Sequence, residues 1–389
     1  MYLIGIDISK YKHDCFIATE TGEVIKDVFS FDNNQKGFTI LLNILEALDP
    51  IHEKRIGLEA TGHYGYNLKA FLDQHDYTFM ELNPFLVSKF ATSLSLRKTK
   101  TDKADSKLLS MILLSVEYKI YPVKSYHIQD LKTLTRFYRY LVKSRSKETV
   151  NITNILDYMF PEFKPFFSNV FSTTALFILS EYKTPTKIAR MNKQSYHRIR
   201  SISRGRFSYA KFIKLKDLAK NTIGSSSALL QLQLQSVLNV YKSLTQEINN
   251  LKHQLLLEAS EINSPVFSIK GVSIISGLSI IAEYGNFISF KNPSQLLSFA
   301  GLEPSVIQSG TMNKTGRMVK RGSPYLRETI MNVSMYFTIH NPTIYDYYNK
   351  KRSEGKAHRV ALTHVAKKLL RIIFHLTKSN QEFDQTKLK

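Results

Sequence analysis

Short apolar runs separated by turn residues fill the first third of the chain. β-prone runs predict strands, and apolar residues at helical spacing predict helices between them. The predicted strands are 2–8, 15–18, 24–31, 55–58 and 78–82, and the predicted helices are 37–48, 64–75 and 102–116. The first three strands, joined by short turns, predict an antiparallel meander. The whole order predicts a mixed sheet with flanking helices over roughly residues 1–120.

The middle of the chain is helical in pattern. Residues 128–159 predict a basic helix that Pro161 and Pro165 break. Residues 166–224 predict helices joined by loops, with basic stretches at 198–200 and 204–206, and no chemistry can be assigned to them from the pattern.

A heptad pattern distinguishes residues 225–259. Apolar side chains alternate by four and three without a slip at Leu230, Leu234, Val237, Tyr241, Leu244, Ile248, Leu251 and Leu255. This spacing is typical of a coiled coil that joins two subunits. One long amphipathic helix packed on its own domain is the alternative.

The pattern changes again after Pro265. Residues 274–282 and 290–300 predict two helices next to the glycine turns at Gly271 and Gly301, which resembles a helix-hairpin-helix that offers backbone N–H groups to a phosphate. Residues 356–378 predict a basic amphipathic helix, which either follows a phosphate backbone or is a solvated face. The predicted fold class is therefore α/β plus all-α.

Composition narrows the choice of partner. The chain has 389 residues, 54 Lys and Arg against 32 Asp and Glu, and a formal net charge of +22. This excess favours a polyanion, with nucleic acid ahead of an anionic membrane surface. The single cysteine, Cys15, excludes a disulfide framework within one chain. Without a signal-peptide-like or membrane-spanning run, we expect a soluble, cytoplasmic protein with no membrane partner.

Four acidic residues are the candidate chemistry. Asp7 lies inside an apolar strand, where a carboxylate is costly unless something neutralises it. Glu59 ends a later strand. Asp102 and Asp105, three apart at a helix start, share one face. Such carboxylates can hold two Mg²⁺ ions about 3.5–4 Å apart, and Mn²⁺ suits the same oxygen ligands.

Each acidic residue also has a simpler interpretation. Asp7 suits a turn or an ion pair, Glu59 an ion pair with Arg55, and Asp102 a helix N-cap. Together, the strand-borne Asp and the final D-x-x-D favour a ribonuclease-H-like nuclease. Three nearby lysines suit a phosphodiester backbone, namely Lys98, Lys100 and Lys103.

Four blocks of sequence resemble the DEDD transposases of the insertion-sequence 110 group, the bridge-RNA-guided recombinases. They occur in the family's order and span most of the chain. The blocks are Gly5-Ile6-Asp7-Ile8-Ser9-Lys10, then Glu59-Ala60-Thr61-Gly62-His63-Tyr64, then Asn83-Pro84 with Lys100-Thr101-Asp102-Lys103-Ala104-Asp105, and finally Ser309-Gly310 with Gly316, Lys320, Gly322, Leu326 and Arg327.

The resemblance implies a domain organisation. It predicts a RuvC-like DEDD nuclease domain over 1–160, a helical linker and coiled coil over 161–262 with heptads at 230–255, and a transposase domain over 263–389. It also implies that Asp7, Glu59, Asp102 and Asp105 are the metal-binding tetrad.

The resemblance further implies that Ser309 attacks DNA and forms a covalent intermediate. The residues alone favour a turn serine in a polar loop, because no histidine lies close in sequence to activate the hydroxyl. We expect the basic residues around it to bind nucleic-acid phosphates, namely Lys314, Arg317, Lys320, Arg321 and Arg327. Two departures from the family pattern, Ser106 and Ser323, have no evident chemical duty.

The sequence therefore predicts an insertion-sequence transposase that exchanges DNA strands with Mg²⁺. The implied partners are donor and target DNA, a noncoding guide RNA and further copies of the chain in a homodimer or tetramer, in the cytoplasm and nucleoid of a prokaryote. One alternative is a Holliday-junction-resolvase-like endonuclease with water as nucleophile. The other is a basic nucleic-acid-binding scaffold with an inactive nuclease fold.

Overall fold

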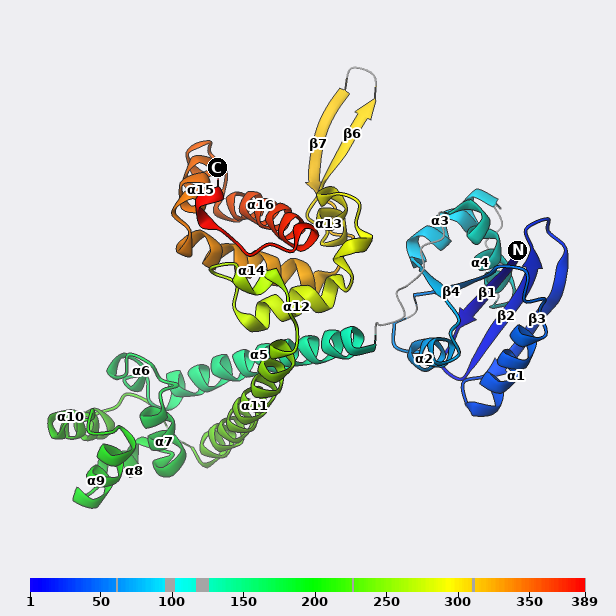
Figure 1. The fold of residues 1–389 in the computed structure, drawn as a ribbon. Coiled ribbons are helices and arrows are strands. Elements are labelled where there is room, and N and C mark those ends of the chain that lie inside the picture. The colour runs from blue at the N-terminus through cyan, green and yellow to red at the C-terminus, as the bar shows by residue number, and fades with distance from the viewer. Residues whose placement is uncertain (61, 95–101, 117–125, 226, 310–311, 389) are drawn as a thin grey trace. The chain divides into compact units, whose positions relative to one another are not determined.

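The computed structural model describes residues 1–60, 62–94, 102–116, 126–225, 227–309 and 312–388. Within these ranges, only the backbone is described at 94, 102–103, 126–127, 305–309 and 312–317. The chain divides into two compact units, Met1–Gln129 and Asp130–Lys389, whose elements Figure 1 labels.

The first unit contains a five-stranded mixed sheet of order β3-β2-β1-β4-β5. Its strands are β1 (Tyr2–Ile8), β2 (Lys12–Thr19), β3 (Val24–Asp32), β4 (Lys54–Glu59) and β5 (Phe79–Leu82). β1, β2 and β3 form the antiparallel meander that the sequence predicts. β4 and β5 add to the other edge of β1 in parallel, which makes the sheet mixed as expected.

Helices cover both faces of this sheet. They are α1 (Gln35–Glu46), α2 (Tyr66–Gln74), α3 (Pro84–Leu94) and α4 (Asp102–Ser115). Alternate residues of β1, such as Ile4 and Ile6, pack on α1 and α2 through Phe38, Leu41 and Phe71. α3 and α4 pack together near β5 through Val87 and Leu109. The pattern did not predict α3, whose eleven residues begin at Pro84, with only one residue between it and the end of β5.

Two long helices lie almost wholly in the second unit. α5 (Tyr126–Met159) and α11 (Ala228–Ser260) are each about 50 Å long at 1.5 Å per residue. Between them lie the short helices α6 (Phe163–Phe166), α7 (Thr173–Tyr182), α8 (Pro185–Ala189), α9 (Lys193–Ile202) and α10 (Tyr209–Lys220). The predicted helices joined by loops are therefore present. One buried cluster joins them to the end of α5 at Ile155 and to the start of α11 at Leu234.

The heptad positions of α11 divide into two sets. Leu234, Tyr241, Ile248 and Leu255 are buried within the single chain. Leu234 and Tyr241 pack on the short helices, and Leu255 packs on α5 and the next helix. The other repeat positions, including Leu244 and Leu251, are only partly buried. Leu230 and Val237 also pack on the core of the short helices, so six of the eight repeat positions serve the helix's own unit. A coiled coil between subunits stays a prediction.

The C-terminal half of this unit is helical with one β-hairpin. Its elements are η1 (Pro265–Ser268), α12 (Ile274–Tyr284), η2 (Phe287–Ser289), α13 (Pro293–Phe299), β6 (Pro304–Ser309), β7 (Met312–Met318), α14 (Pro324–His340), α15 (Pro342–Ser353), α16 (His358–Ser379) and η3 (Gln385–Lys387). α13 begins later than the predicted 290–300 helix because Asn292 caps it. The loop predicted around Ser309 is wrong, since Ser309 ends strand β6.

Every helix in the part of the chain that the structure describes is too short or too polar to cross a lipid bilayer.

Candidate functional site

Two of the predicted metal ligands occupy one row across the sheet. β1 and β4 run parallel with Ile6 beside Leu58, so the next residues along, Asp7 and Glu59, are neighbours. Side chains in one row lie on one face of a sheet. Asp7 shares its face with Gly5, opposite the face that packs on α1 and α2. Both carboxylates are only partly buried, so solvent reaches this edge of the row.

Helix α4 packs closely on this face because two glycines lie under it. A Cβ at Gly5 would lie 2.2 Å from the Ser106 carbonyl oxygen and 2.5 Å from the Ser110 nitrogen. A Cβ at Gly57 would lie 2.9 Å from the Leu113 side chain. Ser106, fully buried, therefore has a packing role that the sequence did not suggest. Asp105 immediately precedes it on α4, and Gly5 lies two residues before Asp7 on β1.

A third carboxylate of the row was missed from the sequence. Asp14 on β2 lies directly opposite Asp7 in the antiparallel ladder. It is 2 % exposed, accepts a short hydrogen bond from the Ser30 hydroxyl, and lies 3.7 Å from the Lys12 ammonium nitrogen. The pattern placed the start of this strand at Cys15, which left Asp14 in a turn. Its position directly before the apolar run Cys15-Phe16-Ile17-Ala18 was the available signal.

The remaining sequence candidates of the first unit are only partly described. Asp102 is the first residue of α4 and Lys103 follows it, but their side chains lie outside the description, as do Lys98 and Lys100 entirely. Among the described residues, no three His, Cys, Asp or Glu side chains gather closely enough to hold a metal ion. Arg55, considered as an ion-pair partner of Glu59, contacts Glu53 at 3.0 Å.

The second unit places Ser309 at the outer end of a β-hairpin. β6 ends at Ser309 and β7 begins at Met312, and these two residues pair. Lys314 pairs with Ile307, and Arg317 lies on β7 nearer the base. Figure 1 shows the hairpin extending from the helices of its own unit. Of the basic residues predicted near Ser309, Lys314 and Arg317 therefore lie along the neighbouring strand, whereas Lys320, Arg321 and Arg327 follow it in the chain.

The base of the hairpin is held by contacts to backbone atoms of the neighbouring segments. The Arg327 guanidinium donates to the carbonyl oxygens of Ala300 and Lys320, each at 3.3 Å. A Cβ at Gly322 would lie 1.9 Å from the Phe299 carbonyl oxygen, so only glycine fits there. Lys320, with φ of 57°, takes the left-handed turn that this approach requires. Arg327 thus has a structural role, whereas the exposed Lys320 and Arg321 face solvent.

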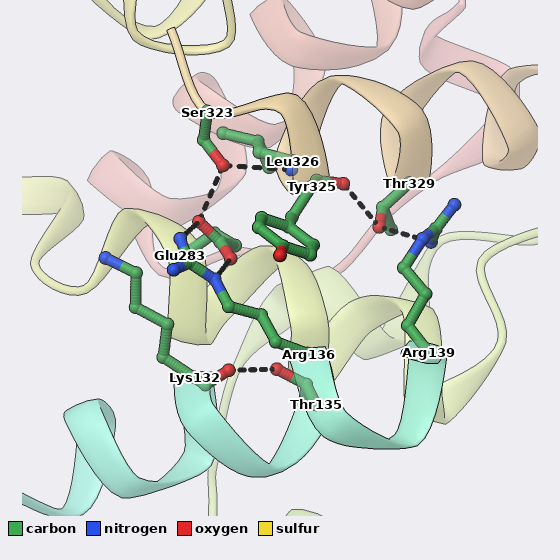
Figure 2. A network of polar contacts seen from close by, with 9 residues as sticks. All are labelled: Lys132, Thr135, Arg136, Arg139, Glu283, Ser323, Tyr325, Leu326 and Thr329. Atoms are coloured by element: carbon green, nitrogen blue, oxygen red, sulfur yellow. Dashed lines mark hydrogen bonds and ion pairs between the residues drawn. The ribbon is translucent and has the colours of Figure 1, made fainter. Parts of the chain in front are cut away.

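Below this base lies a buried ion pair, which Figure 2 shows in detail. Glu283 of α12, 4 % exposed, accepts two hydrogen bonds from Arg136 of α5, at 2.6 and 2.9 Å. The Ser323 hydroxyl donates to the same carboxylate at 2.8 Å and accepts from the Leu326 N–H at the start of α14. Ser323, the second departure from the family pattern, therefore joins α14 to the pair.

Further cations surround Glu283. The Arg136 guanidinium also lies 4.5 Å from the centre of the Tyr325 ring, a cation–π contact. Burial lowers the pKa of Lys132 on the same face of α5, and the Glu283 charge opposes this effect. One turn further along, Arg139 donates to Thr329 at 3.1 Å. The network fixes α5 against α12 and α14, directly beneath the hairpin that bears Ser309.

The fold and these sites define a nuclease-like sheet domain joined to a helical unit. A family model described as a DEDD transposase of IS110 matches residues 4–161. A second, described as transposase of the IS116/IS110/IS902 family, matches residues 263–349. The chain belongs to the IS110 family of transposases and is a DNA recombinase of the transposase class.

Curated relatives agree over most of the chain. The pilin gene-inverting protein of Moraxella bovis is 24 % identical over 98 % of this chain and 97 % of its own length. The uncharacterised 44.8 kDa protein of insertion element IS116 from Streptomyces clavuligerus is 20 % identical over 98 % of this chain and 95 % of its own. The IS110 protein of Streptomyces coelicolor is 27 % identical over 33 % of this chain and 32 % of its own.

Proposed function

We propose that this transposase cleaves and exchanges DNA strands by transesterification at a divalent-metal site formed by Asp7, Glu59, Asp102 and Asp105. The observation that supports the proposal is the shared row of Asp7 and Glu59, together with the close packing of α4, at Ser106, on Gly5 of the same strand. Carboxylate oxygens are the ligands that Mg²⁺ prefers, and Mn²⁺ is the other ion they suit. A bound ion would polarise the phosphodiester and stabilise charge on the departing oxygen.

The residues of the chain then have distinct duties. The four acidic residues would hold the cations, namely Asp7, Glu59, Asp102 and Asp105. Asp14, in the same row as Asp7, would add negative charge beside it, while Ser30 and Lys12 keep Asp14 in place. The Ser309 hydroxyl would attack the phosphorus, with loss of its proton and departure of a DNA hydroxyl. The products are a serine–DNA phosphodiester and a free DNA end. A second DNA hydroxyl would reverse the step and join new ends.

The tetrad is tested with Asp7→Asn and Glu59→Gln, which keep the shape and remove the charge. We expect strand cleavage to fall by at least about 10³-fold in each, as expected when an ion loses a ligand. The readout is cleavage of end-labelled element DNA across an Mg²⁺ titration, and Asp32→Asn at the exposed end of β3 is the matched control. Cleavage at the unaltered rate in both variants would remove the tetrad hypothesis.

The serine is tested separately with Ser309→Ala and Ser309→Cys. We expect Ser309→Ala to abolish recombination and the protein–DNA adduct, which denaturing electrophoresis detects as a shifted labelled band. Ser309→Cys should restore part of the adduct. Ser305→Ala, on the same strand, is the control. Ordinary recombination by Ser309→Ala would instead support water as nucleophile, as in a junction resolvase.

We also propose that a noncoding guide RNA pairs with donor and target DNA, so that the protein reads backbone and shape. The support is the resemblance of this chain to the bridge-RNA-guided recombinases, together with the net charge of +22, which suits binding of two nucleic acids. RNA that copurifies with the chain, when sequenced, should map to DNA beside the gene. Purified protein that recombines DNA equally well after ribonuclease treatment would contradict this part of the proposal.

A further inference from the structure

Positive charge is concentrated in the short helices between α5 and α11. Residues 161–224 contain 13 Lys and Arg against 3 Asp and Glu, a net charge of +10 out of +22 for the chain. Per residue this is about four times the density of the remaining chain. The stretch also lies between the two segments that the family models match, residues 4–161 and 263–349. Its charge is therefore not explained by either matched domain.

Much of this charge has no partner among the residues that the structure describes. We define the α9–α10 basic surface as Lys193, Arg200, Arg204, Arg206, Lys211 and Lys214. All six are exposed, and within the described chain none of them lies within ion-pair distance of an Asp or Glu. The neighbouring Arg198 differs, because it pairs with Glu181 at 2.8 Å. Six unpaired cations on one helix–turn–helix repel one another, a cost that an external polyanion would offset.

The α9–α10 basic surface is formed by helices that pack on a hydrophobic core. Buried Phe212 and Leu215 of α10, together with Ile199 of α9, belong to the core that joins the short helices to α5 and α11. The Tyr196 ring of α9 lies 5.0 Å from the Tyr209 ring of α10, so the two helices are side by side. The cations thus project from packed helices and need little ordering when a ligand binds.

The connecting turn brings two arginines to the outside. Arg204 has φ of 53° and Gly205 has φ of 80°, and the Gly205 N–H closes the end of α9 on the Arg200 carbonyl at 2.8 Å. Next to this turn, Tyr209 is 53 % exposed and offers a flat ring among the cations.

We propose that the α9–α10 basic surface binds the phosphate backbone of duplex DNA, as a contact separate from the nuclease domain and the hairpin. Arginine and lysine without sequence-reading neighbours suit sequence-independent phosphate contacts. Duplex DNA is the partner because the chain is a DNA recombinase and must hold long DNA segments while strands exchange. Anionic membrane is disfavoured, since Tyr209 and Ile213 are its few exposed apolar side chains.

The test is a charge-neutralised full-length chain carrying Arg204→Gln, Arg206→Gln, Lys211→Gln and Lys214→Gln. The control carries Lys26→Gln, Lys36→Gln, Lys242→Gln and Lys252→Gln, four exposed lysines elsewhere, so both proteins lose the same charge. Binding of a labelled random-sequence 40-base-pair duplex is measured by fluorescence anisotropy from 50 to 300 mM KCl. Thermal melting confirms that both variants fold.

We expect the first variant to bind at least about tenfold more weakly at 0.1 M salt. The slope of log affinity against log salt should shrink by about 2–3.6, because each phosphate contact contributes about 0.9. The control should change the slope by less than about 0.5. A charge-keeping variant, Arg204→Lys with Arg206→Lys, should retain the slope.

Three outcomes overturn the proposal. The first is an equal slope in the test and control variants. The second is an unchanged DNA slope with affinity lost only for an RNA duplex, and the third is the same result with phosphatidylserine-containing vesicles. None of them bears on the tetrad or on Ser309, whose tests measure cleavage and adduct formation.

Discussion

Gly5 leaves no room for a side chain between β1 and α4. Because a Cβ there would meet backbone atoms of Ser106 and Ser110 within 2.5 Å, neither rotamer change nor side-chain movement relieves the clash. We expect Gly5→Ala to lower the free energy of unfolding by about 2–3 kcal/mol and to move Asp105 away from Asp7. Urea unfolding measures the first effect, and metal-dependent cleavage, which should fall more than DNA binding, measures the second.

Gly57→Ala is the matched comparison under the same helix. Its Cβ would meet only side-chain atoms of Leu113, at 2.9 to 3.2 Å, which can move. We expect it to cost about half as much and to spare cleavage. If Gly57→Ala were the more damaging of the two, close backbone approach of α4 at Gly5 would not be what positions the carboxylates.

We expect His13 to make the stability of the first unit sensitive to acid. Burial lowers its pKa from the usual 6.5, more than the neighbouring Asp14 charge raises it. Below pH 6.5 the unfolded chain therefore binds a proton that the folded chain rejects, so stability falls as pH falls, by up to about 1.4 kcal/mol per pH unit. His13→Phe should flatten this slope, since the ring already packs 5.3 Å from Phe31.

Urea unfolding at pH 7, 6 and 5 checks this expectation, with the exposed His253→Gln as the control. A slope in His13→Phe as steep as in the unaltered chain would show that another group carries the acid sensitivity.

Individual residues were predictable where a strand pattern made them conspicuous. Asp7 and Glu59 interrupt or end apolar strands, so their placement followed from the pattern. Asp14 was lost because Lys12-His13-Asp14 is polar and resembles a turn, although pairing with β1 extends the strand through it. Ser323 gave no signal at all, because its partner Glu283 is 40 residues away in the sequence.

The ion pair between α5 and α12 is joined to the start of α14, next to the hairpin base, through the Ser323 hydroxyl. Glu283→Gln would leave Arg136 facing a neutral group and keep the shape. We expect a loss of about 2–4 kcal/mol in the free energy of unfolding. Because α14 and the hairpin base rest on the same carboxylate, the rate of adduct formation at Ser309 should fall while affinity for DNA changes little.

The control is Glu328→Gln on the neighbouring turn of α14. Glu328 contacts Arg139 and Lys143 at a more exposed position, so its loss should cost about 1 kcal/mol or less and leave the adduct rate intact. A double-mutant cycle of Glu283→Gln with Arg136→Lys measures the coupling. Equal effects of the two Glu→Gln changes on adduct formation would contradict a positioning role for Glu283.

At the scale of elements, the periodicity of apolar residues predicted those strands and helices that pack on a hydrophobic core. The strands of the sheet and the long helices α5, α11 and α16 follow apolar spacing, and their bounds differ from the predictions by few residues. The hairpin β6–β7 was missed because its strands pair only with each other, without an apolar face. The turn signals Ser309-Gly310 and Asn313 therefore indicated a loop.

At the scale of the whole molecule, helix α11 carries the surface through which two copies of the chain could associate. Its buried heptad positions are satisfied within the chain, but Leu244 and Leu251 are only partly covered and lie on the same repeat. We expect these two to pack against a second copy, as the unbroken 4-3 spacing predicts. Leu244→Glu with Leu251→Glu should therefore convert dimers into monomers without lowering the thermal stability of the chain by more than a few degrees.

Sedimentation velocity at micromolar concentration distinguishes the possibilities, with Lys242→Glu and Lys252→Glu as controls on the exposed side of α11. Dissociation by the leucine changes alone would establish the coiled coil and would explain why the repeat continues past the residues that the chain itself buries. If the mass is unchanged by both pairs, α11 serves only its own unit. The partial exposure of Leu244 and Leu251 would then be ordinary for a long helix, because many apolar side chains stay exposed on protein surfaces.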